Sequence, residues 1–320
     1  MKILNVSYIL QNSQILEGKA LAFDKTIQKI APLDELLHLY PDSEVIDTEP
    51  NSLIMPGLIN SHVHLEFSAN KTTLKYGKFL PWLHSVIENR DDLITNCDSE
   101  CMKKATDLML SSGITSFGAI SSHGMDLEAA AKAKQNVVFF NEIIGSQATM
   151  ADALFDDFKS RLAASESIKR EGFYPAIAVH SPYSVHPALI KKGVELAKLR
   201  NYPLSAHYME SPAEREWLDS NEGDFKPFFT EFLKQDYAVN SSKDFLKIFK
   251  DTPTLFTHVV QANEDELKEL KESNHTIIHC PISNRLLGNG ALDLDKLEEH
   301  NIKWLCGTDG LSSNYNLNLF

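Results

Sequence analysis

The chain has 320 residues, of which 43% are hydrophobic and 23% charged, so it is long enough for one large globular domain or two ordinary ones. Its 31 Lys and Arg residues against 44 Asp and Glu residues give a formal net charge of -13. This charge argues against a nucleic acid polymer as partner, because such binding needs clustered cations. No run approaches the length of a membrane span, and the first residues lack the continuous apolar core of a signal peptide.

Four cysteines, Cys97, Cys101, Cys280 and Cys306, are spread over the whole chain. Without a secretion signal, this usage predicts reduced thiols in a cytoplasmic protein and no disulfide framework. Cys97 and Cys101 lie four residues apart in a stretch of helical composition, but they lack the further cysteine partners that a metal site needs. We expect Cys280 and Cys306 to lie in the core.

Residues 1–52 predict the N-terminal portion of a small β-sandwich. Short mixed segments at 2–9, 15–23 and 26–30 are interrupted or separated by residues that favour turns, such as Gly18 within the second and Asp24 after it, which is typical of antiparallel strands.

From residue 53 onward, short apolar or β-branched runs alternate with helical stretches, the pattern of βα units around a parallel sheet. Eight such runs occur, at 53–60, 114–121, 137–144, 176–180, 204–207, 254–260, 276–279 and 303–307. The length of the stretch that holds them is close to the ~250 residues typical of a (β/α)8 barrel. We therefore predict an α/β fold with a TIM barrel over residues 53–320; a doubly wound open sheet is the competing architecture.

Two histidines, His62 and His64, follow the first of these runs. On an extended chain, residues i and i+2 point the same way, so both imidazoles can bind one metal ion. A His-x-His pair is weak evidence alone, but in a βα barrel the carboxyl ends of the strands build the active site.

Four more polar residues lie at the ends of other predicted strands. His207 and Glu210 belong to the fifth, His258 to the sixth and Asp309 to the eighth. Taken alone, each has an ordinary explanation, because a lone histidine in an apolar run is usually a satisfied core residue and an aspartate can cap a helix or a turn. Because these groups and the His-x-His pair all fall at the carboxyl ends of separate strands, we predict that they form one site.

The segments around these residues resemble the amidohydrolase superfamily, and specifically its branch of cytosine-, guanine- and adenosine-type deaminases. The matching stretches are 55–64, 180–185, His207 with Glu210, 257–258, 279–285 and 307–310. The resemblance implies one divalent metal ion held by His62, His64, His207 and Asp309. Zn²⁺ suits these ligands and Fe²⁺ is the alternative. Binuclear relatives place a carbamylated Lys on strand four, and the run at 176–180 has no Lys, so we expect a mononuclear site.

These parts suggest a hydrolytic deamination. We expect Asp309 to accept the proton of the attacking water, Glu210 to protonate the ring nitrogen beside the attacked carbon, and His258 to orient the hydroxide.

The chain looks most like the aminodeoxyfutalosine deaminases of the futalosine route to menaquinone. This resemblance implies an adenine nucleoside, 6-amino-6-deoxyfutalosine, whose C5′ side carries a carboxyphenyl ketone. Trp82 is the candidate for stacking on the purine, His180 for contacting the ribose, and Ser283 and Asn284 for lining the pocket. Arg285 is the candidate cation for the carboxylate. The alternatives are that Trp82 is an aromatic plug under a loop and that Arg285 is a surface residue.

Other functions stay open at this point. Within enzymes, the alternatives are a deaminase of S-adenosylhomocysteine, methylthioadenosine or adenosine, or a related guanine deaminase or chlorohydrolase. Outside the enzymes, the alternative is a non-catalytic metal-binding barrel. We expect a small-molecule nucleoside as partner and favour a homodimer. Because few residues follow Asp309, we also expect that the chain lacks a C-terminal segment with the last barrel helix and part of the sandwich.

Overall fold

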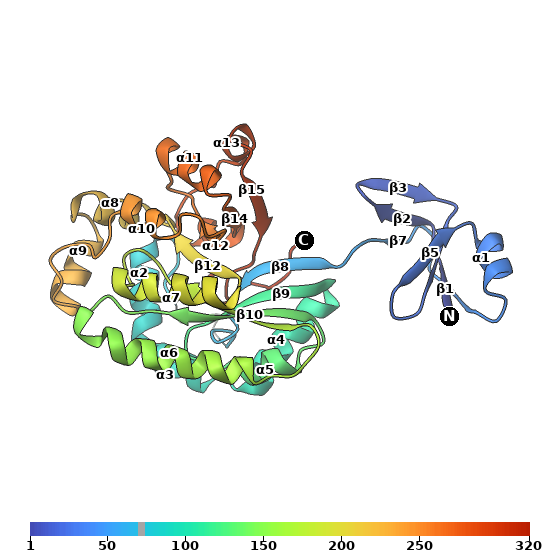
Figure 1. Ribbon diagram of the computed structural model, residues 1–320, viewed down its shortest axis with the longest axis horizontal. Helices are drawn as coiled ribbons and strands as arrows, with labels where there is room; N and C mark the ends of the chain where they lie inside the picture. The colour runs from blue at the N-terminus through green and yellow to red at the C-terminus, as the bar shows by residue number, and fades with distance from the viewer. Residues whose placement is uncertain (70–73) are drawn as a thin grey trace. The chain divides into compact units, whose positions relative to one another are not determined.

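A computed structural model describes residues 1–69 and 74–320, which form two compact units, Met1–Gly57 and Leu58–Phe320 (Figure 1). We refer to them as the N-terminal unit and the barrel unit.

The N-terminal unit consists of two small sheets and one helix, α1 (Leu33–Leu39). Buried side chains of β1, β4 and α1, among them Ile3, Ala22 and Leu36, form its core. In order across the sheets, the strands are β5 (Ile27–Ala31), β4 (Ala20–Phe23), β1 (Lys2–Asn5) and β6 (Glu44–Asp47) in one, and β3 (Gln14–Glu17), β2 (Tyr8–Gln11) and β7 (Leu53–Ile54) in the other. The prediction of a small N-terminal β portion is thus confirmed.

The barrel unit contains eight parallel strands whose order in the sheet follows the order in the chain. They are β8 (Leu58–Val63), β9 (Ile114–Ser121), β10 (Asn136–Ile143), β11 (Phe173–Val179), β12 (Leu204–Tyr208), β13 (Leu255–His258), β14 (Thr276–His279) and β15 (Lys303–Cys306). The predicted first strand, 53–60, is divided, because its first residues pair with β2 in the N-terminal unit and only Leu58 onward pairs with β9.

The chain after β15 brings the last strand back to the first. The backbone N–H groups of Thr308 and Asp309 donate to the carbonyl of His62 at 3.2 and 3.0 Å, and the side chain of Asn60 bonds to Thr308. A Cβ atom at Gly307 would lie 2.9 Å from the Cβ of His62, so glycine permits this close approach. The predicted eight-stranded barrel is therefore confirmed, and the open sheet is excluded.

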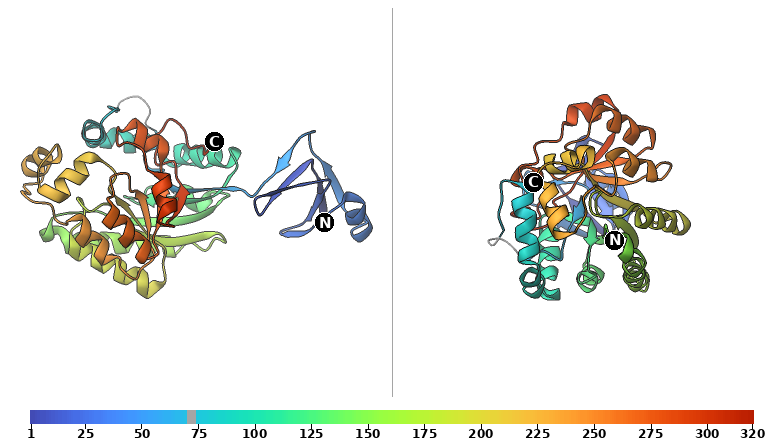
Figure 2. Two further views of the ribbon diagram at one scale, coloured as in Figure 1. Left: turned by 90° about the horizontal axis from the view of Figure 1, so that it is seen from above. Right: turned by 90° about the vertical axis from the view of Figure 1, so that its left-hand side faces the viewer.

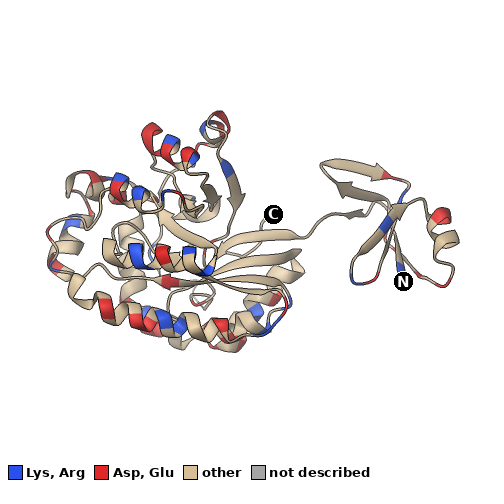
Figure 3. Ribbon diagram, viewed as in Figure 1, with Lys and Arg blue, Asp and Glu red and all other residues tan. Residues whose placement is uncertain are grey.

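Helices cover the outside of the strands (Figure 2). Most charged residues of the barrel unit lie on these helices, and the barrel strands carry few of them (Figure 3). In chain order the described helices of the barrel unit are α2 (Phe79–Glu88), α3 (Arg90–Thr95), α4 (Ser99–Ser111), α5 (Leu127–Lys132), η1 (Ala148–Met150), α6 (Ala151–Glu166), α7 (Pro187–Arg200), α8 (Pro212–Ser220), α9 (Phe225–Pro227), η2 (Phe228–Phe232), α10 (Ser242–Ile248), α11 (Glu264–Glu272), α12 (Pro281–Leu286) and α13 (Leu294–Glu299). No helix in this part of the chain is long and apolar enough to cross a bilayer.

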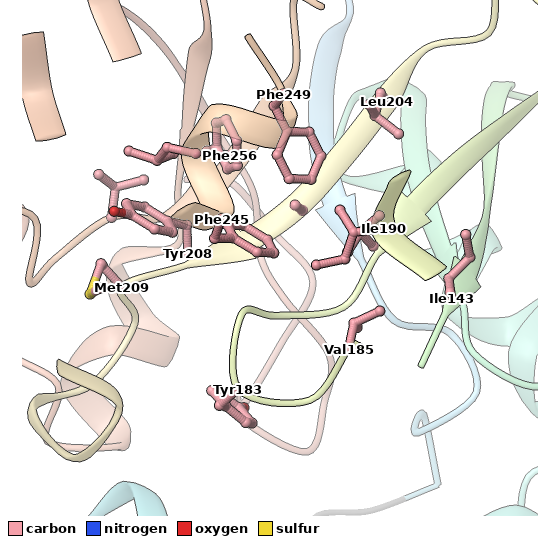
Figure 4. Close-up of a cluster of buried hydrophobic side chains, with 14 of the residues drawn as sticks. Ile143, Tyr183, Val185, Ile190, Leu204, Tyr208, Met209, Phe245, Phe249 and Phe256 are labelled. Atoms are coloured by element: carbon pink, nitrogen blue, oxygen red, sulfur yellow. The ribbon is translucent and has the colours of Figure 1, made fainter. Parts of the chain in front are cut away.

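A large apolar core fixes the strands that carry the site. Figure 4 shows aromatic side chains of α10 and of β12 and β13 packed together. The rings of Tyr208 and Phe245 stack with centroids 5.9 Å apart, and those of Phe249 and Phe256 meet edge to face at 5.3 Å. Tyr208 directly follows His207 and Phe256 lies two residues before His258, so this packing holds both histidines in place.

The prediction of four reduced cysteines is wrong for one pair. Cys97 precedes the N-cap residue of α4, Asp98, and Cys101 lies in the first turn of that helix, with Cα atoms 5.2 Å apart, and the two form a disulfide. The sequence pattern predicted one helical stretch across both residues, whereas helix α3 ends at Thr95 and α4 begins only at Ser99, after the cap residue. Cys280 and Cys306 are free, the first buried and the second half-buried.

One buried ion pair links α8 to α11. The Glu266 carboxylate accepts hydrogen bonds from Arg215, at 3.0 Å from its Nη1, and from the backbone N–H of Asn263 at 2.9 Å. Burial alone would raise the pKa of Glu266, but these hydrogen bonds outweigh it and hold the pKa below its ordinary value.

We expect Glu266→Gln to lower the free energy of unfolding by about 3 kcal/mol at neutral pH, because Arg215 loses its buried counter-charge. A carboxyl group with a lowered folded-state pKa stabilises the fold above its unfolded pKa, 4.5, and this contribution is lost as the pH falls. Urea unfolding of the variant and the unchanged protein should therefore differ at neutral pH and converge in acid. The same difference at both pH values would contradict this account.

Candidate metal centre and active site

Three imidazoles converge at the carboxyl end of the barrel. His62 lies near the end of β8, His64 directly follows this strand, and His207 lies on β12; each offers a nitrogen, and these atoms all lie within 4.8 Å of one another. From the chain after β15, beside β8, Oδ1 of Asp309 lies 3.6 Å from Nε2 of His62 and 3.5 Å from Nε2 of His64. The structure thus brings together all four residues predicted as metal ligands.

The donor atoms of this group fit a metal ion. Nε2 of His62 is buried and has no hydrogen-bond partner among the described residues, whereas its Nδ1 lies 3.1 Å from the Thr257 hydroxyl. Nδ1 of His207 lies 3.0 Å from the carbonyl of His180, so that nitrogen donates its proton and leaves Nε2 with a free lone pair. Partners of this kind fix the tautomer that a histidine ligand needs.

Burial also keeps His64 and His207 neutral. It lowers the pKa of His64 to about 3 and that of His207 well below its ordinary value, and the neighbouring imidazoles lower the latter further. Metal binding requires neutral imidazole, so these groups need not lose a proton at neutral pH. Three imidazoles and one carboxylate are a ligand set that Zn²⁺ accepts.

Two hydroxyl groups orient the carboxylate of Asp309. Ser283 and Ser313 each donate to its Oδ2 at 2.7 Å, so Oδ1 is the oxygen that faces the histidines. Burial alone would raise the pKa of Asp309, but the adjacent imidazoles of His62 and His64 hold it well below its ordinary value, and the group is ionised. Ser283, predicted to line the pocket, is buried and instead positions Asp309.

The backbone is strained at three of these strand ends. Met209, His258 and Asp309 have φ angles of 50°, 74° and 59°, in the left-handed region that non-glycine residues rarely adopt. Each such residue costs about 1–3 kcal/mol, and such residues cluster at functional sites. Here they lie after β12, at the end of β13 and after β15, where the chain turns sharply beside the site.

Glu210 lies beside the metal-binding group and has its own supports. Its Oε1 accepts a hydrogen bond from Asn289 at 3.2 Å and lies 3.7 Å from Nε2 of His258. The carboxylate of Glu214 accepts the backbone N–H groups of Met209 and Glu210 at 3.0 and 2.7 Å, which holds the turn that presents Glu210. Burial raises the pKa of Glu210 well above its ordinary value, and the charges of Asp309 and Glu214 add to this effect. A carboxyl group in this state can donate a proton.

His258 is held from behind by Asn284. Nδ1 of His258 lies 2.8 Å from Oδ1 of this asparagine, so Nδ1–H donates to the amide and Nε2 points its lone pair toward Glu210. Asn284, predicted as a pocket residue, is buried and orients His258. Burial lowers the pKa of His258 to about 4, so the ring is neutral.

A cavity opens onto the metal-binding group. Trp82 lies on one wall, where its indole Nε1 donates to the carbonyl of Ser312 at 2.7 Å and so fixes the plane of the ring. Nδ1 of His180 bonds to the hydroxyl of Ser184 at 2.6 Å, which leaves Nε2 for another partner. Arg285 is exposed on α12 and is not among the lining residues. The lining consists of His64, Phe67, Phe79, Trp82, Leu83, Val86, Ser122, His123, Ile144, His180, Tyr183, His207, Glu210, His258, Asp309 and Ser312.

Several residues that support the site gave no clear signal in the sequence. Glu66 is buried and its carboxylate accepts the backbone N–H groups of Ser122, His123 and Met125, which fastens the loop after β9 to the barrel end. Asn289, which bonds to Glu210, lies in a loop without a motif. Glu214 had one signal, because it stands three residues after Ser211 in a capping pattern, but its carboxylate serves the neighbouring turn.

The sequence profile of the amidohydrolase family matches residues 53–320. The chain belongs to this family. Amidohydrolases are metal-dependent hydrolases, and the predicted resemblance is confirmed.

Amidohydrolases of known activity resemble the chain over its whole length. The aminodeoxyfutalosine deaminase of a Nitratiruptor species is 48% identical over 320 residues, which cover all of this chain and 78% of that protein. The adenosine deaminase of Helicobacter pylori is 35% identical over 314 residues, or 97% of this chain and 76% of the relative. The crystal structure of H. pylori aminofutalosine deaminase with methylthio-coformycin superposes with a TM-score of 0.92 at 34% identity and covers 99% of this chain and 79% of that one. These relatives are hydrolases that act on C–N bonds, and so is this amidohydrolase.

Proposed function

We propose that the chain is a metal-dependent deaminase that converts 6-amino-6-deoxyfutalosine to its hypoxanthine form in the futalosine route to menaquinone. One water molecule is consumed and the exocyclic amine at C6 of the adenine leaves as ammonia. The observation that carries the proposal is the grouping of a metal-binding set with Glu210, a buried carboxyl group that favours its protonated form, at the end of one cavity. The 48% identity to an aminodeoxyfutalosine deaminase supports the choice of substrate.

The residues divide the proton transfers among them. A bound divalent ion supplies Lewis-acid chemistry, since it lowers the pKa of water to ~7. Asp309 accepts a proton from the attacking water, and Glu210 donates its proton to the ring nitrogen beside C6. His258 fixes the attacking oxygen through Nε2. Asp309 then gives its proton to the leaving amine, and Glu210 takes the hydroxyl proton as the C6 carbonyl forms, so both carboxyl groups return to their starting states.

The cavity suits a flat base with a ribose attached. The fixed indole of Trp82 offers a face for stacking on the purine, and the free Nε2 of His180 offers a hydrogen bond to a ribose hydroxyl. Together with the metal-binding group in the lining, these contacts favour a nucleoside over a free base.

A substrate panel on metal-loaded protein tests the proposal. We expect the ultraviolet change from adenine to hypoxanthine with aminodeoxyfutalosine, with kcat/KM at least about tenfold above that for adenosine, methylthioadenosine or S-adenosylhomocysteine. Equal values for adenosine and aminodeoxyfutalosine would contradict the choice of substrate and favour the second candidate, an adenosine deaminase, which the 35% identity to such an enzyme supports. Absence of ammonia with every nucleoside and with guanine would favour the non-catalytic barrel.

Two finer parts of the proposal concern the ion and the assembly. Three imidazoles and a carboxylate favour Zn²⁺, with Fe²⁺ as the alternative, and metal analysis of protein purified without added metal distinguishes them. The cytoplasmic location and the homodimer stay predictions. Light scattering, which measures the mass in solution, tests the homodimer.

A further inference from the structure

Glu142 approaches the metal-binding group from β10. The ring centroids of His207, on β12, and of His62, on β8, lie 4.9 Å apart, although three strands separate β8 from β12 in the sheet. Side chains from strands this far apart meet only inside the barrel. Oε1 of Glu142 lies 3.6 Å from Nδ1 of His207, across the intervening strand β11. Glu142 therefore points into the barrel, beside a residue of the proposed ligand set.

One oxygen of the Glu142 carboxyl group has no hydrogen-bond partner. The side chain is fully buried, and the Ser122 hydroxyl donates to Oε2 at 2.6 Å. Oε1, which faces His207, accepts no hydrogen bond from the described residues. Arg161 donates to the backbone carbonyl of Glu142 and to Asp157, and no Lys or Arg in the described part of the chain forms an ion pair with Glu142. A buried carboxylate of this kind is unfavourable unless positive charge lies close by.

The proposed ligand set leaves positive charge for Glu142 to oppose. Asp309 supplies its one carboxylate, whereas the ion is divalent. Behind the imidazoles the partners are uncharged, since the Thr257 hydroxyl lies beside Nδ1 of His62 and the carbonyl of His180 accepts from His207. Among the described residues, Glu142 is the one carboxylate outside the set that lies within ion-pair distance of a ligand imidazole.

We propose that Glu142 is a positioning residue of the metal centre, whose carboxylate opposes the positive charge that a bound ion places on His207 and so raises the affinity for the ion. A carboxylate behind a histidine ligand has this effect in metal sites generally. At 3.6 Å the contact is longer than a hydrogen bond, so Glu142 acts through its charge, and the carbonyl of His180 fixes the direction of Nδ1–H. The inference rests on the proposed metal centre and is independent of which nucleoside binds.

Asp126 offers a matched control. It is buried, one of its oxygens accepts the Ser121 hydroxyl at 2.5 Å, and the other has no hydrogen-bond partner among the described residues. It thus repeats the arrangement of Glu142, but within the described ranges it forms no ion pair with a ligand imidazole. The variants to compare are Glu142→Gln, Glu142→Asp and Asp126→Asn.

Each protein is loaded with Zn²⁺ and then titrated with a chelating dye of known affinity. We expect Glu142→Gln to raise the dissociation constant for Zn²⁺ about 10- to 100-fold, and Asp126→Asn to leave it within about threefold. Glu142→Asp should recover part of the loss, because it keeps the charge. Glu142 lies outside the cavity lining, so turnover of Glu142→Gln should fall when Zn²⁺ is limiting and return to within about threefold of normal in excess Zn²⁺.

The thermal midpoint of the zinc-free protein separates this role from a structural one. It should not fall in Glu142→Gln, because the new amide oxygen can still accept the Ser122 hydroxyl. A lower midpoint would assign Glu142 a structural role and overturn the inference.

The zinc titration can also overturn it. An unchanged dissociation constant in Glu142→Gln would do so, as would an equal rise in Asp126→Asn. The unchanged protein is read first: if it binds no Zn²⁺, the proposed metal centre itself fails. If it binds Zn²⁺ and Glu142→Gln binds the ion as tightly, the inference alone fails.

Discussion

Glu210→Gln should lower kcat about a thousandfold while the metal content stays unchanged. Glutamine has nearly the same shape, and its amide oxygen can still accept the hydrogen bond from Asn289. It has no acidic proton to give to the ring nitrogen, so the loss falls on the chemical step. Single-turnover kinetics and metal analysis measure the two effects separately.

Glu216→Gln is the matched control, because Glu216 lies on the same helix as Glu214 but is exposed and outside the cavity. It should leave kcat unchanged. If Glu210→Gln turned over at the normal rate, Glu210 would not be the proton donor. If it lost the metal, its role would be structural.

The second large effect is expected for Asp309→Asn. This change should lower turnover roughly ten-thousandfold and also weaken metal binding, because it removes the only carboxylate in the proposed ligand set and the proposed acceptor of the water proton. The hydroxyl groups of Ser283 and Ser313 can rotate to accept from the new amide, so the fold should survive. Turnover, metal content after dialysis and the thermal midpoint should be measured on the same sample.

Asp295→Asn on α13 is the control for loss of one acidic charge, since Asp295 is exposed and is not among the residues that line the cavity. It should keep both activity and metal. An Asp309→Asn variant that retained a full complement of metal and normal turnover would exclude Asp309 from the site.

The sequence revealed the parts of the barrel that depend on local pattern. An apolar run that ends in a histidine or an acidic residue marks a strand and its functional end together, which is why His62, His207 and Asp309 were predicted correctly as neighbours. A local pattern does not say which sheet a strand joins. Leu53–Ile54 was therefore assigned to the barrel, whereas it pairs with β2.

The rest of the site depends on contacts between distant segments. Ser283 and Asn284 were predicted at the site but not in their roles, because only packing shows that they bond to Asp309 and His258 and do not line the cavity. The disulfide was not predicted, because the sequence pattern indicated one helix across both cysteines, whereas the N-cap at Asp98 lies between them.

The most direct test of hydrolytic deamination is the reaction of metal-loaded protein with aminodeoxyfutalosine in water enriched in heavy oxygen. Hydrolytic deamination at C6 predicts that ammonia and the hypoxanthine product appear in equal amounts and that mass spectrometry finds one solvent oxygen in the base. Product without solvent oxygen, or no product from protein that carries its metal, would contradict the account.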